Sequence, residues 1–407
     1  MSKFSKYSKV FNYGQLFLSF SIIFGTWVIY IPTIKNKLGM SEGDLGIALL
    51  TSAIGALIGT PLGKILTNKF GEGKIAFSST VTLCFMGIHI FLAPSYYWLC
   101  LALFMFGFTT AIMQVSINSL VVVVEKKQKI SIMAMCHGYF SLGGLLSAGL
   151  GTFIVIWLNN PILHIIFSAT IVFILQLGLK NNYFNIIRQQ EVQQHKKNIG
   201  NVFGSILLWA LAVIGVTSMV AEGAIADWSG LFLIDVAHVN LEYVGLGYAG
   251  FSLSMTIGRF TGDYISNKIG AWQIIVGGYL ISLVGFVVVL IAQSYLSILG
   301  FILVGVGFSS IVPQVFRQSA NVTGIDSAGG IAFLSAASNI GFIGGPFVLG
   351  LIAERYNLTV SFIATTMLVL LGTLTSIVIF IGQRNKRTNE TVTATLKSNS
   401  SKAIKAC

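Results

Sequence analysis

Long apolar stretches recur along the whole of this 407-residue chain. A helix needs about 20 residues to cross roughly 30 Å of hydrocarbon, and inside lipid only helices and closed barrels satisfy every backbone hydrogen bond. The sequence therefore predicts an all-α membrane protein with twelve transmembrane helices. The expected spans are 13–34, 44–66, 74–93, 97–124, 131–157, 161–181, 204–234, 243–264, 271–292, 296–319, 327–352 and 359–382.

Charged residues are too scarce for a water-soluble surface. They make up 9% of the chain and hydrophobic residues 55%, whereas soluble domains carry about 25% charged residues. The net charge of +12 could suggest nucleic acid. With twelve spans, however, all of the 25 Lys and Arg except Lys35, Lys37 and Arg355 fall on the side that holds both termini. This asymmetry follows the positive-inside rule, so we expect cytoplasmic termini, a lipid bilayer around the helices and no nucleic-acid partner.

The second part of the chain repeats the first. Residues 46–71 and 245–270 align at an offset of 199, and seven of their 26 positions are identical. A second match, at an offset of 200, joins 107–115 to 307–315. Internal repeats of this kind are typical of secondary transporters. We therefore expect two pseudo-symmetric six-helix halves.

A single polar break divides the chain. Residues 180–201 carry Asn, Gln, Lys and His in place of apolar residues and are too short for a folded domain. The end of the chain is rich in Thr, Ser, Asn and Lys, which is typical of disorder. We expect an N-terminal half over 1–179, a cytoplasmic linker over 180–201, a C-terminal half over 202–382 and a disordered cytoplasmic tail over 383–407.

Neither a cofactor nor a metal is expected. The phosphate-binding pattern G-x-x-x-x-G-K-[ST] is missing, because Ile follows both Gly63-Lys64 and Gly73-Lys74. The four cysteines show neither a disulfide framework nor the spacing of metal ligands. ATP is therefore not the expected source of energy, and any coupling must come from an ion gradient.

The loop after the second helix of each half resembles a known signature. Both loops contain Asn-Lys-x-Gly, where the major facilitator superfamily carries an acidic residue, a basic residue and then Gly. Asn68 and Asn267 stand in the acidic position, and Lys69 and Lys268 in the basic one. The resemblance implies the major facilitator fold and a gating role for these four residues, although the missing acids remove the loop's usual charge relay.

Three longer segments carry a narrower resemblance. Residues 136–143, 221–228 and 248–262 are similar to bacterial inner-membrane transporters near the fucose permease branch. This resemblance implies a proton-linked carrier of a small solute that works as a monomer in the bacterial cytoplasmic (inner) membrane.

Three titratable residues are candidates for proton coupling. Glu222 falls near the middle of the seventh span, where an ionised carboxylate is expensive to bury and tends to be kept for function. The alternative is a structural carboxylate that a neighbouring helix satisfies. Asp227 lies about 140° further around the helix, near the expected outer mouth. His137 in the fifth span could relay protons or bind substrate, or it could be a core histidine.

Amide side chains are candidates for substrate binding. Gln114 and Asn118 are four residues apart and share a helical face, and Gln314 is the repeat partner of Gln114. We expect them, with Asn339, to line a central cavity, because amides offer paired donors and acceptors to hydroxyl groups. Hydrogen bonding between helices is the alternative. At the position that matches Gln114, the resemblance to the fucose permease implies a proton-carrying Glu. This chain has Gln there, so the resemblance does not make Gln114 a proton carrier.

Aromatic residues and one arginine complete the candidates. Trp27, Tyr30 and Trp228 could stack on a substrate ring, although aromatic residues at the membrane interface are common in any membrane protein. Arg259 precedes Asp263 by four residues, a spacing that suits an ion pair and predicts a gate or anchor.

These observations lead to one hypothesis and two alternatives. We hypothesise a secondary transporter that moves a small polar, sugar-like solute by alternating access with proton symport. One alternative is a proton antiporter that exports drugs or amphipathic metabolites. The other is a receptor or scaffold that keeps the fold and transports nothing. An enzyme is not expected, because neither a metal-ligand cluster nor a nucleophile and base can be recognised.

Overall fold

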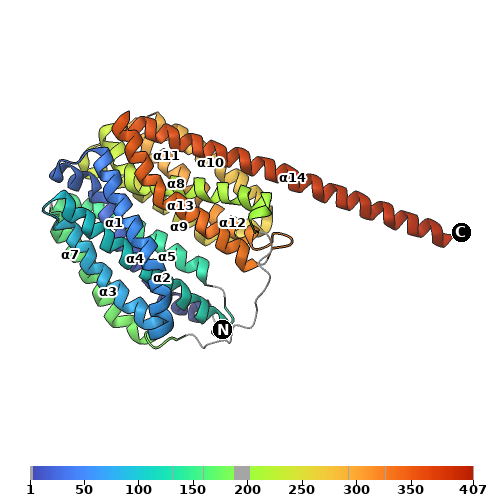
Figure 1. Ribbon diagram of the computed structural model, residues 1–407, viewed down its shortest axis with the longest axis horizontal. Helices are drawn as coiled ribbons and strands as arrows, with labels where there is room; N and C mark the ends of the chain where they lie inside the picture. The colour runs from blue at the N-terminus through green and yellow to red at the C-terminus, as the bar shows by residue number, and fades with distance from the viewer. Residues whose placement is uncertain are drawn as a thin grey trace.

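The structure is a computed structural model that describes residues 3–130, 132–158, 160–187, 202–291, 293–325 and 327–406. Every regular element in these ranges is helical (Figure 1), which confirms the predicted all-α fold. The first half contains α1 (Lys3–Leu38), α2 (Glu42–Phe70), α3 (Glu72–Phe91), α4 (Tyr96–Gln128), α5 (Met133–Leu145), η1 (Leu146–Leu150), α6 (Gly151–Leu158), α7 (Pro161–Leu179) and η2 (Lys180–Asn182). The second contains η3 (Val202–Gly204), α8 (Ile206–Asp235), η4 (Leu241–Tyr243), α9 (Leu246–Ile269), α10 (Ala271–Leu290), α11 (Ser294–Phe308), α12 (Ile311–Ser319), α13 (Ser327–Arg355) and α14 (Leu358–Ala406).

Polar side chains mark where several of these helices begin. Ser41 and Asp44 form a capping box at the start of α2, in which each side chain bonds the other residue's backbone N–H. Asn160 accepts two backbone N–H groups at the start of α7 and is followed by a proline, which suits the first turn of a helix. Ser205 caps α8 in the same manner. The helix starts therefore follow from local sequence.

Eleven helical segments in the described ranges are long and apolar enough to cross a membrane. The predicted eighth span is α9, which has 24 residues but is not among the eleven. Its many Gly, Ser and Thr residues make it less apolar than the others. Two predicted spans are interrupted: 131–157 contains a π-helical turn between α5 and α6, and 296–319 breaks at Ser309 and Ser310 between α11 and α12.

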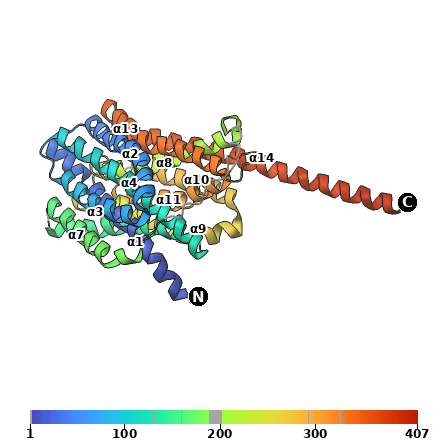
Figure 2. The same ribbon diagram turned by 60° about the horizontal axis from the view of Figure 1, so that its bottom comes forward.

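The helices pack as two groups. In the first, α2 packs against α4, α1 against α5 and α7, and α3 against α4. In the second, α8 packs against α13 and α14, and α10 against α11. Figures 1 and 2 show the two groups side by side. They meet where α2 contacts α13, where α5 contacts α9 and where α1 contacts α8. Helix α7 ends at Leu179, and residues 188–201 of the predicted linker lie outside the described residues.

The internal repeat extends to the backbone angles. Gly71 after α2 has φ 94° and ψ 150°, and Gly270 after α9 has φ 98° and ψ 152°. Each glycine also donates its N–H to the carbonyl four residues earlier, on Thr67 and Ser266 respectively. Residues other than glycine rarely adopt this region of φ and ψ. The same turn therefore ends the second helix of both halves.

One end of the contact between the halves is tightly closed. The backbone N–H of Gly43, in the first turn of α2, donates to the Glu354 carboxylate of α13 at 3.0 Å. One turn further along α2, a Cβ placed on Gly46 would lie 3.1 Å from the Gly350 Cα. Only glycines allow the two helices to approach so closely. From this end the two groups of helices diverge in Figure 1.

Helix α14 continues far beyond the bundle (Figures 1 and 2). It runs to Ala406 and so crosses residues 383–406, for which the sequence predicts disorder. An isolated helix without tertiary packing is only marginally stable in water. Disorder of this tail in solution therefore stays a prediction.

Candidate functional site

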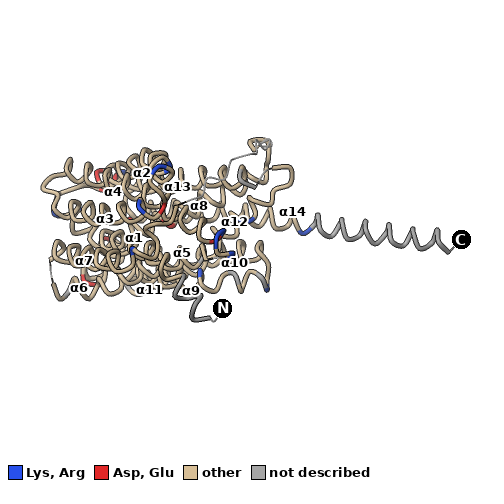
Figure 3. Tube along the Cα trace, turned by 90° about the horizontal axis from the view of Figure 1, so that it is seen from below, with Lys and Arg blue, Asp and Glu red and all other residues tan. Residues whose placement is uncertain are grey.

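Arg259 of α9 connects the two halves of the bundle. One guanidinium nitrogen, Nη2, lies 3.6 Å from Oε2 of Glu222 on α8. The other, Nη1, donates to Oγ of Ser141 on α5 at 2.7 Å and to the His137 carbonyl at 3.5 Å. The side chains of Glu222 and Arg259 are only 14% and 15% exposed. Charges are sparse on the chain trace in Figure 3, so this ion pair between membrane-spanning helices is unusual.

Glu222 has only part of its hydrogen-bonding capacity filled. Its Oε1 is buried and has no hydrogen-bond partner among the described residues. Asp227, Tyr248 and Tyr279 complete a polar cluster, since Tyr248 lies within electrostatic range of both carboxylates and Tyr279 within range of Glu222. The Glu222 carboxylate thus has one cation at 3.6 Å and one oxygen without a donor among the described residues.

Sequence reasoning chose a different partner for Arg259. It predicted Asp263, four residues along the same helix, and the side chain of Asp263 lies outside the described residues. Reasoning from the sequence also missed Ser141. The available signal was the small-residue spacing of α5, where Gly138, Ser141 and Gly144 recur every third residue. That spacing allows α9 to approach α5 closely.

The other two candidates for proton coupling lie in the same region. The exposed His137 ring packs edge-on against Phe17 of α1, with 5.1 Å between ring centroids. Asp227 is half-buried on α8, about five residues beyond Glu222. The structure therefore brings the Glu222 carboxylate and the backbone carbonyl of His137 to the Arg259 guanidinium, and Asp227 lies five residues beyond Glu222 on α8.

The three aromatic candidates are packed inside the bundle. Tyr30 donates to or accepts from His164 Nδ1 on α7 at 3.2 Å, within the first half. Trp27 is 2% exposed. Trp228 is also buried, close to Gly350 at the closed end, and its indole Nε1 has no partner among the described residues. Contact between any of these rings and a substrate stays a prediction.

The four amide candidates have different surroundings. Gln114 is exposed on α4, and Asn118 donates to the backbone carbonyl of Gln114 at 2.8 Å. Gln314 on α12 is 1% exposed, and its Oε1 has no partner among the described residues. Asn339 is exposed on α13. A buried amide oxygen without a donor is costly, so Gln314 is the amide that most needs a further partner.

The lysines of the repeated loops each lie over an aromatic ring, although the two rings occupy different positions in the repeat. The Lys69 ammonium lies 5.3 Å from the centroid of the Phe70 ring, and the Lys268 ammonium lies 4.4 Å from that of Tyr264. Asn68 is exposed, and the side chain of Asn267 lies outside the described residues. Both lysines therefore rest on an aromatic ring of their own helix, a cation–π contact.

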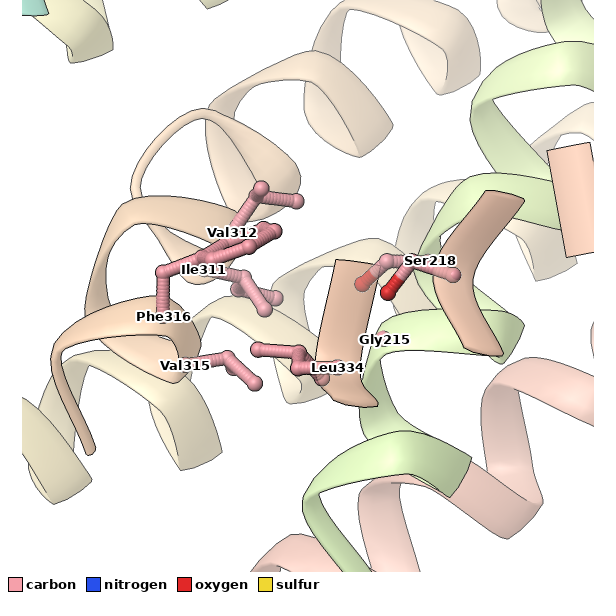
Figure 4. A pocket seen from close by; sticks show the side chains of 8 residues that line it. Gly215, Ser218, Ile311, Val312, Val315, Phe316 and Leu334 are labelled. Atoms are coloured by element: carbon pink, nitrogen blue, oxygen red, sulfur yellow. The ribbon is translucent and has the colours of Figure 1, made fainter. Parts of the chain in front are cut away.

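A small pocket lies beside the cluster, between α8, α12 and α13 (Figure 4). The non-atom space there, including open solvent, is about 180 Å³, but the gaps between the side chains leave no room for a water molecule in this conformation. Two hydroxyl groups line the pocket, those of Ser338 and of Ser218, which lies one helical turn before Glu222. Its lining residues are Gly215, Ser218, Ile311, Val312, Val315, Phe316, Leu334 and Ser338. In the described part of the chain, His, Cys, Asp and Glu form no group of three that could hold a metal ion.

Comparison with known proteins gives consistent results. The family profile described as Major Facilitator Superfamily matches residues 14–329 and 239–405. An uncharacterized MFS-type transporter of Yersinia pestis is 31% identical over 348 residues, which cover 84% of this chain and 88% of that protein. Membrane protein MosC of Rhizobium meliloti is 30% identical over 345 residues, covering 84% and 83%. The crystal structure of the nucleoside transporter NupG superimposes with a TM-score of 0.68 at 15% identity, covering 91% of this chain and 99% of that one.

Proposed function

The chain belongs to the major facilitator superfamily, and from this premise we propose that it is a proton-coupled secondary transporter of a small polar solute. Its membership and its transporter-named relatives make it a multi-pass membrane transporter and not an enzyme. Its narrower likeness to the fucose permease branch, the direction of transport and the coupling ion belong to the proposal. So do the bacterial inner membrane, the cytoplasmic termini and the monomeric state.

The contact of Glu222 with Arg259 is the observation that carries this proposal. Glu222 belongs to the second half, whereas Arg259 also bonds Ser141 of the first. A proton on Glu222 cancels its charge and weakens the ion pair within the second half, which changes what holds the one guanidinium that also bonds the first half. A carboxylate that is exposed first to one side and then to the other can thereby link proton transfer to the change of access. In this proposal His137 and Asp227 are the further residues that pass protons to or from Glu222.

The substrate is proposed to bind beside this cluster. Gln314 has an unpaired amide oxygen, and the pocket of Figure 4 lies on the same stretch of α12. In the proposed site, Gln114, Asn118 and Asn339 add amides, and Trp27, Tyr30 and Trp228 supply aromatic walls as the bundle rearranges. The lysine loops and Arg259 act as gates.

The first test is a ligand screen on the purified protein in detergent. Thermal stabilisation is measured at acidic and at neutral pH with sugars, organic acids, nucleosides and lipophilic cations. A bound ligand raises the unfolding temperature by an amount that grows with the logarithm of its concentration relative to its Kd. We expect a selective, pH-dependent shift with one class of polar solute, and loss of the pH dependence in Glu222→Gln.

Two results would redirect the proposal. Stabilisation only by varied lipophilic cations would support the alternative of a drug exporter. Stabilisation by a polar solute that the reconstituted protein does not carry across sealed vesicles would support a receptor. A pH dependence that survives in Glu222→Gln would remove this residue from the coupling mechanism.

A further inference from the structure

The position of the Arg259 guanidinium is set mainly by the opposite half of the protein. Its Nη1 lies 2.7 Å from the Ser141 hydroxyl, a full hydrogen bond, whereas its Nη2 lies 3.6 Å from the Glu222 carboxylate. An N–H to carboxylate bond normally measures about 2.7–2.9 Å. The neutral hydroxyl of α5 therefore holds Arg259 more closely than the carboxylate of α8 does.

The packing around Ser141 keeps this geometry rigid. Ser141 is almost fully buried on the face of α5 that contacts α9. One turn to either side, a Cβ on Gly138 would lie 2.8 Å from the Phe260 ring, and one on Gly144 would lie 2.9 Å from the Ser252 hydroxyl. On both sides of Ser141, glycines of α5 therefore make room for side chains of α9, which pack directly against the α5 backbone. Arg259 cannot follow Glu222 without giving up the hydroxyl.

We propose that Ser141 is a positioning residue for proton coupling, which holds Arg259 at a distance from Glu222 so that this carboxylate can be protonated. This inference rests on the proposed coupling role of Glu222 and deepens it. Ser141 and the His137 carbonyl bind Arg259 whatever the charge on Glu222, while the attraction to Glu222 exists only when that carboxylate is ionised. Among the bonds described for the Arg259 guanidinium, proton uptake therefore leaves those to the first half.

Other titratable groups face this pair and belong to the same electrostatic balance. They are Asp227 on α8, Tyr248 on α9, Tyr279 on α10 and His137 on α5. Their positions do not depend on the Ser141 hydroxyl through any hydrogen bond described for it. A variant that lacks only this hydroxyl therefore changes chiefly the distance between Arg259 and Glu222.

The expected effect of Ser141→Ala can be worked out from that distance. Without the hydroxyl the guanidinium is free to close on Glu222, from 3.6 Å to about 2.8 Å. At an effective dielectric constant of about 20, the added attraction favours the ionised carboxylate by about one pH unit. A nearer cation stabilises the charged form, so protonation of Glu222 requires a lower pH.

Infrared difference spectroscopy of the purified protein tests this without a substrate, because the proton itself is the probe. The band of the protonated carboxyl group is followed against pH, and the part missing from Glu222→Gln belongs to Glu222. We expect its midpoint to move about one pH unit to the acid side in Ser141→Ala. It should stay in place in Ser141→Thr, which keeps a hydroxyl. Ser79→Ala is the matched control, because Ser79 is equally buried but bonds only carbonyls of its own helix.

The outcomes separate this inference from the proposed function. An unshifted midpoint in a folded Ser141→Ala protein, or an equal shift in Ser141→Thr, overturns the role of Ser141 and leaves Glu222 as a proton site. A wild-type spectrum with no titrating band that Glu222→Gln removes overturns both proposals. Folding of each variant is checked by its unfolding temperature.

Discussion

Adding a single methyl group at Gly350 should unseal the closed end of the transporter. A Cβ at this position would lie 2.8 Å from the Gly46 Cα and 2.9 Å from the Glu42 carbonyl oxygen, both on α2. Carbon atoms pack at about 3.5–4.0 Å, so α13 and α2 would have to separate by roughly 0.7–1.2 Å. Overpacking of this kind costs about 1–3 kcal/mol. The two shortest contacts exist only in the conformation that brings α2 against α13, whereas the 3.1 Å approach to Trp228 lies within the second half.

The population of the closed conformation should fall accordingly. An energy of about 1–3 kcal/mol corresponds to a change of about 5-fold to 150-fold in the equilibrium between access states. Spin labels on Lys37 and Tyr356, which are exposed at the ends of α1 and α13, report the width of this end in a protein without its native cysteines. We expect Gly350→Ala to add a population at longer distance.

A matched control lies on the same helix. A Cβ added at Gly344 on α13 would have no atom within 4 Å, so Gly344→Ala adds the same methyl group without a clash. Its distance distribution should equal that of the unsubstituted protein. If Gly350→Ala gives that same distribution too, the glycine contact does not hold this end closed, and the reasoning from packing is wrong.

Two further predictions concern stability. Gly71→Ala should lower the unfolding temperature, because the residue must keep φ 94° in a region nearly reserved for glycine, at a cost of about 1–3 kcal/mol; Gly277→Ala, where a Cβ meets nothing within 4 Å, should not lower it. Gln176→Leu leaves the buried Gln15 amide and the Tyr183 hydroxyl without their partner. It should therefore destabilise the first half by about 1–3 kcal/mol, measured as a lower resistance to denaturant. Equal unfolding temperatures for Gly71→Ala and Gly277→Ala, or unchanged resistance in Gln176→Leu, would contradict these two accounts.

The helices and their pairing into halves could be predicted because the signals are local or repeated. Eleven membrane-spanning segments could be predicted because they are both long and apolar. Helix α9 is less apolar, so its prediction rested on its length and on its match to α2. The glycine turns at Gly71 and Gly270 could be recognised from the repeat, and the structure shows the same backbone angles in both. The break at Ser309 and Ser310 has a local signal in Pro313, which lacks the N–H that would bond the carbonyl of Ser309 four residues earlier.

The contacts of the candidate site could be predicted only in part. Glu222 was recognisable because a carboxylate in the middle of an apolar span is rare. Its partner Arg259 was not, because the two residues lie on different helices and no spacing within one helix links them. The predicted pair of Arg259 with Asp263 stays a prediction, since the side chain of Asp263 lies outside the described residues. Ser141 joins the group from the other half of the chain. Such contacts depend on how helices pack in space, which no spacing within a single helix reports.

Proton-driven uptake in sealed proteoliposomes tests the central proposal most directly. The unsubstituted protein and Glu222→Gln are each given the solute identified by thermal stabilisation under two conditions. A pH gradient without solute inside measures accumulation, and solute inside without a gradient measures exchange. We predict that the variant exchanges solute across the membrane but no longer accumulates it with the gradient, because the coupling proton has lost its site. If Glu222→Gln accumulated solute at the same rate as the unsubstituted protein, the proposal that Glu222 couples transport to protons would be contradicted.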